Sequence, residues 1–195
     1  MIYERSLLSF QLHHTYPVLE PFYFSFEKKY DPSPILEMMK DSNYSVPFIT
    51  VALYLAFCYF GQKIMATRNP LRMMPSLAFW NLFLSLFSTY GTIRTVPHLL
   101  NRILTLPFER TICEAPHTAF GAGTCGLAVQ LFIISKIPEL FDTIFIVLRK
   151  KPLIFLHWYH HVTVLLYCWN SYVTESAAGD KNNYDSIVFT YNWLK

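Results

Sequence analysis

The sequence predicts an all-α protein whose helices cross a membrane several times. The chain has 195 residues, of which 53% are hydrophobic and only 15% are charged. A soluble domain carries about 25% charged residues, so this chain has too few polar groups to solvate its own surface. Four apolar segments also approach the length of about 20 residues that a helix needs to cross a bilayer. We therefore predict a multi-pass helical membrane protein.

The predicted spans follow one another without repeats or low-complexity linkers. The first covers residues 44–61 and the second covers residues 76–93. The third lies within residues 119–148, which is too long for one straight crossing. It must therefore tilt, kink at Pro138 or lie partly outside the bilayer. The fourth covers residues 153–172, and the whole chain is expected to form one domain.

Basic residues between the spans predict the orientation, because short cytosolic loops are rich in lysine and arginine. The loop after the first span holds Lys63, Arg68 and Arg72, and the loop after the third holds Arg149, Lys150 and Lys151. Both loops should face the cytosol, which makes residues 1–43 a lumenal N-terminal tail. The net charge of +3 is too small and too scattered to indicate nucleic-acid binding.

Ionisable residues lie inside two of the predicted spans, where hydrocarbon surroundings make them costly. In the third span, "KIPELFDT" contains Lys136, Glu139 and Asp142, and each such group costs about 3 kcal/mol to insert. Lys136 and Glu139 alone could form a structural ion pair that closes the bundle. The fourth span opens with "FLHWYHH", which adds three histidines: His157, His160 and His161. Together these groups favour a functional site.

The two sets of polar residues are predicted to lie at matching depths. At a rise of about 1.5 Å per residue, Asp142 lies about 10 Å and Glu139 about 15 Å from the cytosolic end of the third span. By the same count His157 lies about 9 Å deep, and His160 and His161 about 14 to 15 Å deep. In an antiparallel hairpin Asp142 would face His157, and Glu139 would face His160 or His161. The carboxylates would then fix the tautomers of the imidazoles.

Two other kinds of site fit parts of this pattern. Membrane di-iron desaturases and hydroxylases carry an HxxHH box, but they need several histidine boxes to hold two metal ions. The other histidines of this chain are isolated: His13, His14, His98 and His117. A cysteine nucleophile would need a thiol beside the histidines, whereas Cys168 lies about 10 Å beyond His161 on the same helix. We therefore predict no metal site and no catalytic cysteine.

The motifs resemble those of the fatty-acid elongases, which condense acyl-CoA with malonyl-CoA in the endoplasmic reticulum. "KIPELFDT" is similar to the KxxExxDT motif of that family and "LHWYHH" to its HxxHH box, in the same order and at the same separation. Residues 69–97 further resemble the branch of the family that extends saturated and monounsaturated chains of intermediate length. The resemblance covers about residues 44–180.

The resemblance implies a membrane protein of seven helices, of which this chain holds about four, around a narrow acyl tunnel whose catalytic end is near the cytosol. Such an enzyme is a 3-oxoacyl-CoA synthase. It joins long-chain acyl-CoA and malonyl-CoA, releases CoA and CO2, and uses neither a metal nor a separate cofactor. The implied location is the endoplasmic reticulum membrane, where the protein contacts lipid and can associate with other enzymes of the elongation cycle.

The resemblance also implies roles for the individual residues. His160, the middle histidine of the box, would accept the acyl group as an acyl-imidazole, because a neutral imidazole in a dry site is both a nucleophile and a leaving group. The other residues of the two motifs would orient the reactants, move protons or supply charge: His157, His161, Glu139, Asp142 and Lys136. The phosphates of CoA would meet the nearest basic loop, which contains Arg149, Lys150 and Lys151.

The chain departs from the family pattern after "NSYVTESAAGD". Where the family continues to an NxxxHxxMYxYY motif, this chain reads "KNNYDSIVFTYNWLK". We therefore divide it into a membrane domain at 44–180 and an atypical tail at 181–195, and expect a truncated chain that is inactive by itself. Two alternatives stay open: a non-catalytic membrane fragment that associates with full-length elongase, and a di-iron oxidoreductase.

Overall fold

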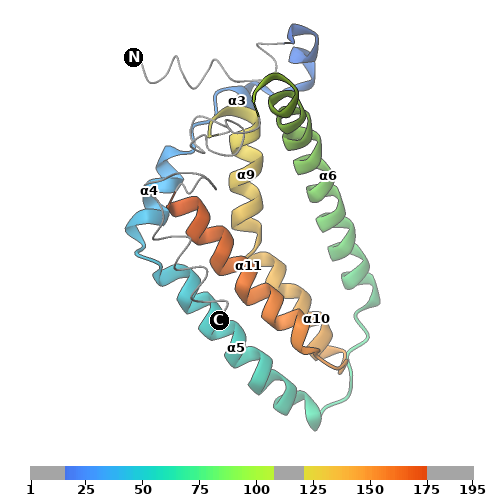
Figure 1. The fold of residues 1–195 in the computed structure, drawn as a ribbon. Helices are drawn as coiled ribbons and strands as arrows, with labels where there is room; N and C mark the ends of the chain where they lie inside the picture. Colours follow the sequence, from blue (N-terminus) through green and yellow to red (C-terminus); the bar gives the residue numbers. More distant parts are fainter. Residues whose placement is uncertain (1–15, 108–120, 175–195) are drawn as a thin grey trace.

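The computed structural model describes residues 16–107 and 121–174, and every regular element in these residues is helical (Figure 1). The all-α prediction is confirmed, whereas the predicted tail at 181–195 lies outside the described residues. In chain order the elements are η1 (Pro17–Phe22), α3 (Ser25–Lys28), α4 (Ser33–Asp41), α5 (Ser45–Ala66), α6 (Met74–Thr105), α9 (Gly123–Ser135), η2 (Pro138–Leu140), α10 (Phe141–Leu148) and α11 (Phe155–Val173).

Helix α5 corresponds to the first predicted span and continues beyond it to Ala66. Among the described residues, it is the one helix that is both long enough and apolar enough to cross a membrane, with a mean hydropathy of 1.4. Its buried residues recur at intervals of three, four or seven, so they form a single face: Pro47, Tyr54, Cys58, Gly61 and Met65. This face packs against α10 and α11.

Helix α6 is longer than the predicted second span, which ended at residue 93. It has 32 residues, and at about 1.5 Å per residue it is about 48 Å long. The basic residues after position 93 do not end the helix, because they recur every four residues and share one buried face: Arg94, His98 and Arg102. The polar face therefore packs on the protein, and the helix continues past the end that its charges predicted.

The third predicted span is broken at Pro138, which is one of the three arrangements expected for it. Helix α9 ends at Ser135, the 3-10 turn η2 follows, and α10 begins at Phe141. Proline cannot donate a backbone hydrogen bond, so the chain changes to bonds between residues three apart. The amide of Lys136 donates to Ile133, and that of Leu140 donates to Ile137, at 3.3 and 3.1 Å. The fourth predicted span is α11, which begins at Phe155.

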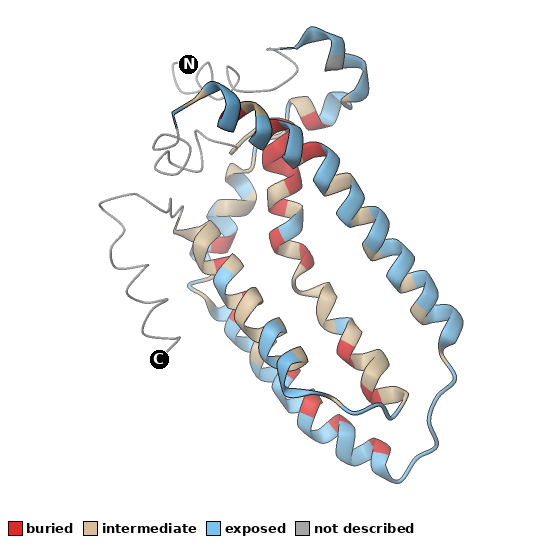
Figure 2. Ribbon diagram, turned by 45° about the vertical axis from the view of Figure 1, so that its right-hand side comes forward, coloured by how far each residue is buried: buried red, intermediate tan, exposed pale blue. Residues whose placement is uncertain are grey.

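Helix α9 is the central helix of the bundle. Nearly every residue from Gly123 to Gln130 is buried, and Figure 2 shows buried positions along this helix and where it meets the end of α6. Met39 of α4, Ile133 of α9 and Trp169 of α11 form a buried hydrophobic cluster that joins the three helices. Residues 1–43 were expected to be a tail, but the described part of this segment packs against α9 and α11, because α4 has its own apolar face.

A buried ion pair joins the N-terminal segment to α6. The Nη2 atom of Arg94 lies 3.1 Å from Oε2 of Glu27, and the two side chains are 8% and 0% exposed. The Tyr90 hydroxyl donates to Oε1 of Glu27 at 2.7 Å, and Arg94 also donates to the carbonyl of Phe22 at 3.0 Å. The guanidinium stands over the ring of Tyr23, and burial raises the pKa of that phenol, so the ring stays neutral.

We predict that Glu27→Gln destabilises the protein by about 3–5 kcal/mol, because it leaves the Arg94 charge buried without its counter-charge. Glu20→Gln is the matched control. Glu20 pairs with Lys28 at 3.1 Å but is 62% exposed, and exposed pairs contribute at most about 1 kcal/mol. Thermal unfolding in detergent micelles measures both variants. Equal stability of the two variants would contradict a stabilising role for the buried pair.

Candidate catalytic site

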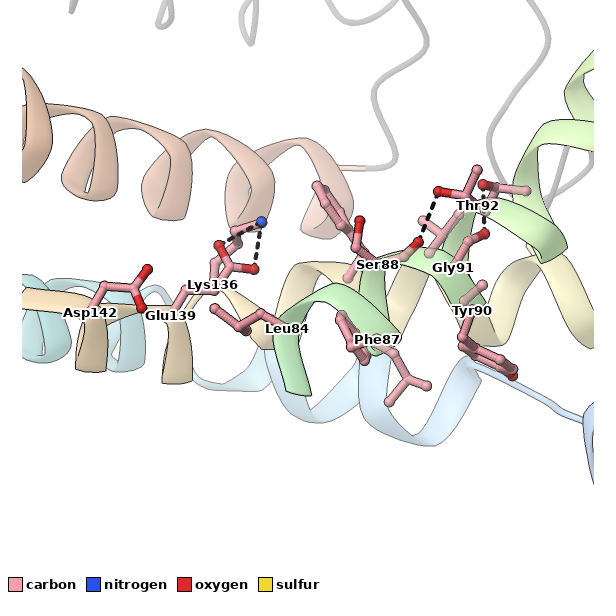
Figure 3. A pocket seen from close by; sticks show the side chains of 14 residues that line it. Leu84, Phe87, Ser88, Tyr90, Gly91, Thr92, Lys136, Glu139 and Asp142 are labelled. Carbon is pink, nitrogen blue, oxygen red and sulfur yellow. Dashed lines mark hydrogen bonds and ion pairs between the residues drawn. The ribbon is translucent and has the colours of Figure 1, made fainter. Parts of the chain in front are cut away.

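The break between α9 and α10 brings the charged residues of the KIPELFDT motif to the wall of a pocket (Figure 3). The ammonium of Lys136 lies 2.8 Å from both carboxylate oxygens of Glu139, and the Ser135 hydroxyl lies 2.9 Å from Oε1. Asp142 instead accepts a hydrogen bond from Nε1 of Trp80 on α6 at 2.5 Å. Each of these half-buried carboxylates therefore has a donor.

The pocket lies between α6 and the broken helix and has a volume of about 450 Å³. Its walls are largely apolar, with Leu84 and Phe87 on α6 and Phe132 on α9, while Lys136, Glu139 and Asp142 supply its charge. In Figure 3 these charged residues lie to one side, and Gly91 lies toward the other. A Cβ atom added at Gly91 would meet no atom within 4 Å, so the space beside this glycine is open. The pocket thus combines a polar region with an open apolar one.

The histidines of the HxxHH box differ in their surroundings. The Nε2 atom of His157 lies 3.0 Å from the hydroxyl of Thr143 on α10. His161 is half-buried, and its ring centre lies 4.6 Å from that of His157 and 6.1 Å from that of Tyr54 on α5. His160 is exposed, and within the described residues its ring contact is with His161, at 5.6 Å. His160 is therefore the most accessible of the three.

The predicted hydrogen-bonded pairs differ from those in the structure. Thr143, not Asp142, bonds to His157, and Glu139 bonds to Lys136 and Ser135 on its own chain segment. Successive helical residues point about 100° apart, so Thr143 faces α5 and α11 while Asp142 faces α6. The partner of His157 is thus one residue away from the predicted Asp142. The polar residues lie in two neighbouring sets, one beside the pocket and one between α5, α10 and α11.

The two sets are adjacent because two consecutive residues of α10 belong to them. Asp142 bonds to Trp80 on the pocket side, and the next residue, Thr143, bonds to His157. Among the described residues, the carboxylates and the imidazoles share no hydrogen bond.

Sequence reasoning did not identify three residues that contact the motifs: Trp80, Tyr54 and Thr143. Thr143 stands at the end of "KIPELFDT", so its position in the motif was an available signal. Tyr54 and Trp80 had none, because the chain has 13 Tyr and 17 Phe, and no pattern separates one aromatic residue from the others. Only the packing of α5 and α6 on α10 selects them.

The sequence predicted no metal site among the residues of the KIPELFDT motif and the HxxHH box. Within residues 16–107 and 121–174, no three His, Cys, Asp or Glu side chains lie close enough together to hold one metal ion. The two carboxylates have the donors described above, and the His157 ring is bonded to Thr143.

The basic loop after α10 contains side chains with structural contacts. The ammonium of Lys150 donates to the carbonyls of Ala66 and Arg68, both at 3.1 Å. It thereby caps the end of α5, where carbonyl groups lack helical partners. Arg149 approaches the sulfur of Met74 at 3.2 Å, and Lys151 is exposed. These contacts give Lys150 a structural role, whereas the sequence predicted only that it meets the phosphates of CoA.

We predict that Lys150→Ala lowers the free energy of unfolding by about 0.5–1.5 kcal/mol, the value of a typical hydrogen bond, because the end of α5 loses its cap. Lys151→Ala is the matched control. It should have little effect, since the exposed Lys151 side chain does not bond to the end of α5. Thermal unfolding in micelles compares the two. If both variants unfold like the unchanged protein, the cap does not contribute to stability.

Comparison with known proteins identifies the same family that the two motifs resemble. Residues 39–182 match the family described as "ELO: GNS1/SUR4 family". The chain is 39% identical over 161 residues to "Very long chain fatty acid elongase 6" of Gallus gallus, covering 80% of this chain and 58% of that protein. It is 38% identical over 161 residues to the Homo sapiens protein of the same name, with 80% and 58% covered.

A further relative comes from a third organism. "Fatty acid elongase 3" of Trypanosoma brucei brucei is 38% identical over 178 residues, which cover 77% of this chain and 59% of that protein. The chain thus spans less than two thirds of the length of these relatives, and no solved structure matches it significantly. With a matching profile over most of its length and the two motifs at the expected positions, the chain belongs to the GNS1/SUR4 (ELO) family of fatty acid elongases.

Proposed function

We propose that this chain carries part of the site at which long-chain acyl-CoA and malonyl-CoA are condensed to 3-oxoacyl-CoA. The observation that carries the proposal is the pair of neighbouring polar sets at the helix break, with carboxylates beside a pocket and an imidazole bonded to the residue that follows Asp142 on the same helix. Ionisable groups at such depth are costly and mark functional sites. The names of the relatives, all fatty acid elongases, support the same reaction class.

His160 is the proposed nucleophile. Its nitrogen attacks the thioester carbonyl of acyl-CoA, the carbon–sulfur bond breaks, and CoA leaves as the thiol with the imidazole proton. Malonyl-CoA then loses CO2, and the resulting enolate attacks the acyl carbon. The carbon–nitrogen bond to His160 breaks, and the imidazole takes a proton back from solvent. The exposure of His160 supports this role, since a nucleophile must be reachable.

The remaining motif residues prepare this step. Lys136 pairs with Glu139 through two contacts of 2.8 Å and so supplies a counter-charge at the wall of the pocket. Asp142, fixed by Trp80, acts as an orienting carboxylate on the pocket side of α10. His157 and His161 orient the reactants, and no metal or separate cofactor is required.

The pocket between α6 and the broken helix is the proposed site of the acyl chain. Its apolar walls suit a hydrocarbon, and the charged residues in its lining suit the reacting end. On this view the acyl chain passes Lys136 and Glu139 so that its thioester extends beyond the charged end of the pocket toward His160, and its methyl end extends toward Gly91. Arg149 and Lys151 of the basic loop are the candidates for the phosphates of CoA, while Lys150 is engaged with the end of α5.

The proposed setting is the endoplasmic reticulum membrane, with the N-terminal segment in the lumen and the basic loops in the cytosol. The proposed membrane domain is residues 44–180, extended by the packed part of the N-terminal segment. Surrounding lipid, and possible association with other enzymes of the elongation cycle, complete the expected partners.

We predict that the change equivalent to His160→Ala abolishes condensation in a full-length relative, because it removes the acyl acceptor. Lys136→Ala should weaken the reaction less severely, since it removes only a counter-charge. Incorporation of radioactive malonyl-CoA into long-chain acyl-CoA measures both variants, and His117→Ala, outside the box, is the control. Substantial condensation by the His160 variant would rule out the acyl-imidazole.

We also predict that Gly91→Leu shifts the accepted acyl chains toward shorter lengths, because the leucine side chain would fill open space in the pocket. Ala78→Leu, at an exposed position of the same helix, is the matched control and should leave the preference unchanged. Competition between acyl-CoA substrates of increasing length, assayed at the aligned positions of a full-length relative, gives the comparison. An unchanged length preference in the Gly91 variant would place the acyl chain elsewhere.

A further inference from the structure

A chain of hydrogen bonds links three helices to the first histidine of the box. The hydroxyls of Tyr54 on α5 and Thr143 on α10 lie 2.8 Å apart, and that of Thr143 lies 3.0 Å from Nε2 of His157 on α11. Tyr54 is 5% exposed and Thr143 is 0% exposed, so water cannot replace either partner. We call these three residues the relay.

The protons of the relay have one arrangement that satisfies every group. If Tyr54 donates to Thr143, then Thr143 donates to His157, and Nε2 of the imidazole accepts. In the opposite direction His157 would donate to Thr143 and Thr143 to Tyr54. The Tyr54 proton would then have only the nearby thiol of Cys58 among the described side chains, and a thiol sulfur is a weak acceptor. A buried donor without a good acceptor costs about 1–3 kcal/mol.

We propose that Tyr54 and Thr143 are positioning residues that hold His157 in the tautomer with its proton on Nδ1. The proposal rests on the proposed function for its consequence in catalysis, but not for the tautomer itself. Because Nε2 accepts the Thr143 hydroxyl, the ring nitrogen of His157 that remains available to the reactants is the protonated Nδ1, which is a hydrogen-bond donor. His157 then stabilises the developing negative charge on a thioester or enolate oxygen.

The same packing fixes the plane of the ring. The ring centre of His161 lies 4.6 Å from that of His157 at an interplanar angle of 68°, and 6.1 Å from that of Tyr54. Tyr54 therefore supports the neighbouring imidazole as well as beginning the relay. A ring held by a hydrogen bond at one nitrogen and by an aromatic edge has little freedom to rotate.

The relay separates the roles of two histidines in one box. His157 has its Nε2 lone pair committed to Thr143, so that atom is unavailable for attack. His160 has no hydrogen bond to its ring within the described residues and is exposed, so it keeps a free lone pair. The environment, rather than the residue type, thus makes one imidazole a donor and leaves the other as the nucleophile.

The tautomer can be measured directly in the chain as it exists. The protein is labelled with ¹⁵N-histidine, placed in micelles and studied by NMR at a pH about two units above the ordinary imidazole pKa. The His157 signals are those lost in His157→Gln. We expect an unprotonated Nε2 and a protonated Nδ1 in the unchanged protein and in Thr143→Ser. Thr143→Val should move the population toward the Nε2-protonated form.

Tyr54→Phe should move the population in the same direction but less far, because Thr143 keeps its hydroxyl. Tyr59→Phe is the matched control on α5: Tyr59 is exposed and bonded to Lys63, so the tautomer should not change. A protonated Nε2 in the unchanged protein would overturn the proposal, whatever the variants do. A Tyr54→Phe spectrum identical to that of the unchanged protein would overturn the role of Tyr54.

The catalytic consequence is tested separately at the aligned positions of a full-length relative. Thr143→Val should lower kcat by about tenfold or more with little change in KM, and Thr143→Ser should restore it, as expected when a wrong tautomer is the defect. If the tautomer is as proposed but His157→Gln keeps full activity, the relay stands and the catalytic role of His157 is wrong. If the tautomer is otherwise, the relay itself is wrong.

Discussion

The arrangement of the site depends on one constraint: a helix that breaks within an apolar bundle must still satisfy its backbone groups. Between α9 and α10 the chain meets this requirement with bonds between residues three apart, around Pro138. An unsatisfied amide in such surroundings would cost several kcal/mol. Because the break changes the direction in which the following side chains point, Lys136 and Glu139 line the pocket while Thr143 faces the histidines.

This division explains how a single motif serves two groups of residues. Asp142 and Thr143 are adjacent in sequence, yet one bonds to Trp80 of α6 and the other to Tyr54 of α5. The broken helix therefore lies between the pocket and the histidines and contributes to both. The two sets are therefore held in a fixed relation by the backbone of α10 and share no hydrogen bond among the described residues.

Other charged residues of this apolar chain have structural roles. Glu27 and Arg94 join the N-terminal segment to α6 through a buried pair, and Lys150 caps the end of α5. Charge in an apolar chain is therefore not by itself evidence of catalysis. The residues of the proposed site are distinguished by a second property, which is their position beside a pocket or beside an accessible imidazole.

The sequence by itself determined the helical class, the positions of α5 and α11 and the residues of both motifs, because hydrophobic length and motif spacing are local properties. It named a kink at Pro138 as one of three arrangements of the third span, and it paired His157 with Asp142, which is one residue from the observed partner. Only the tertiary structure decided that the partner is Thr143, that α6 continues past Arg94, and that Tyr54 and Trp80 contact the motifs. These depend on how each helix is rotated about its axis, and that rotation is fixed by packing between helices far apart in the sequence.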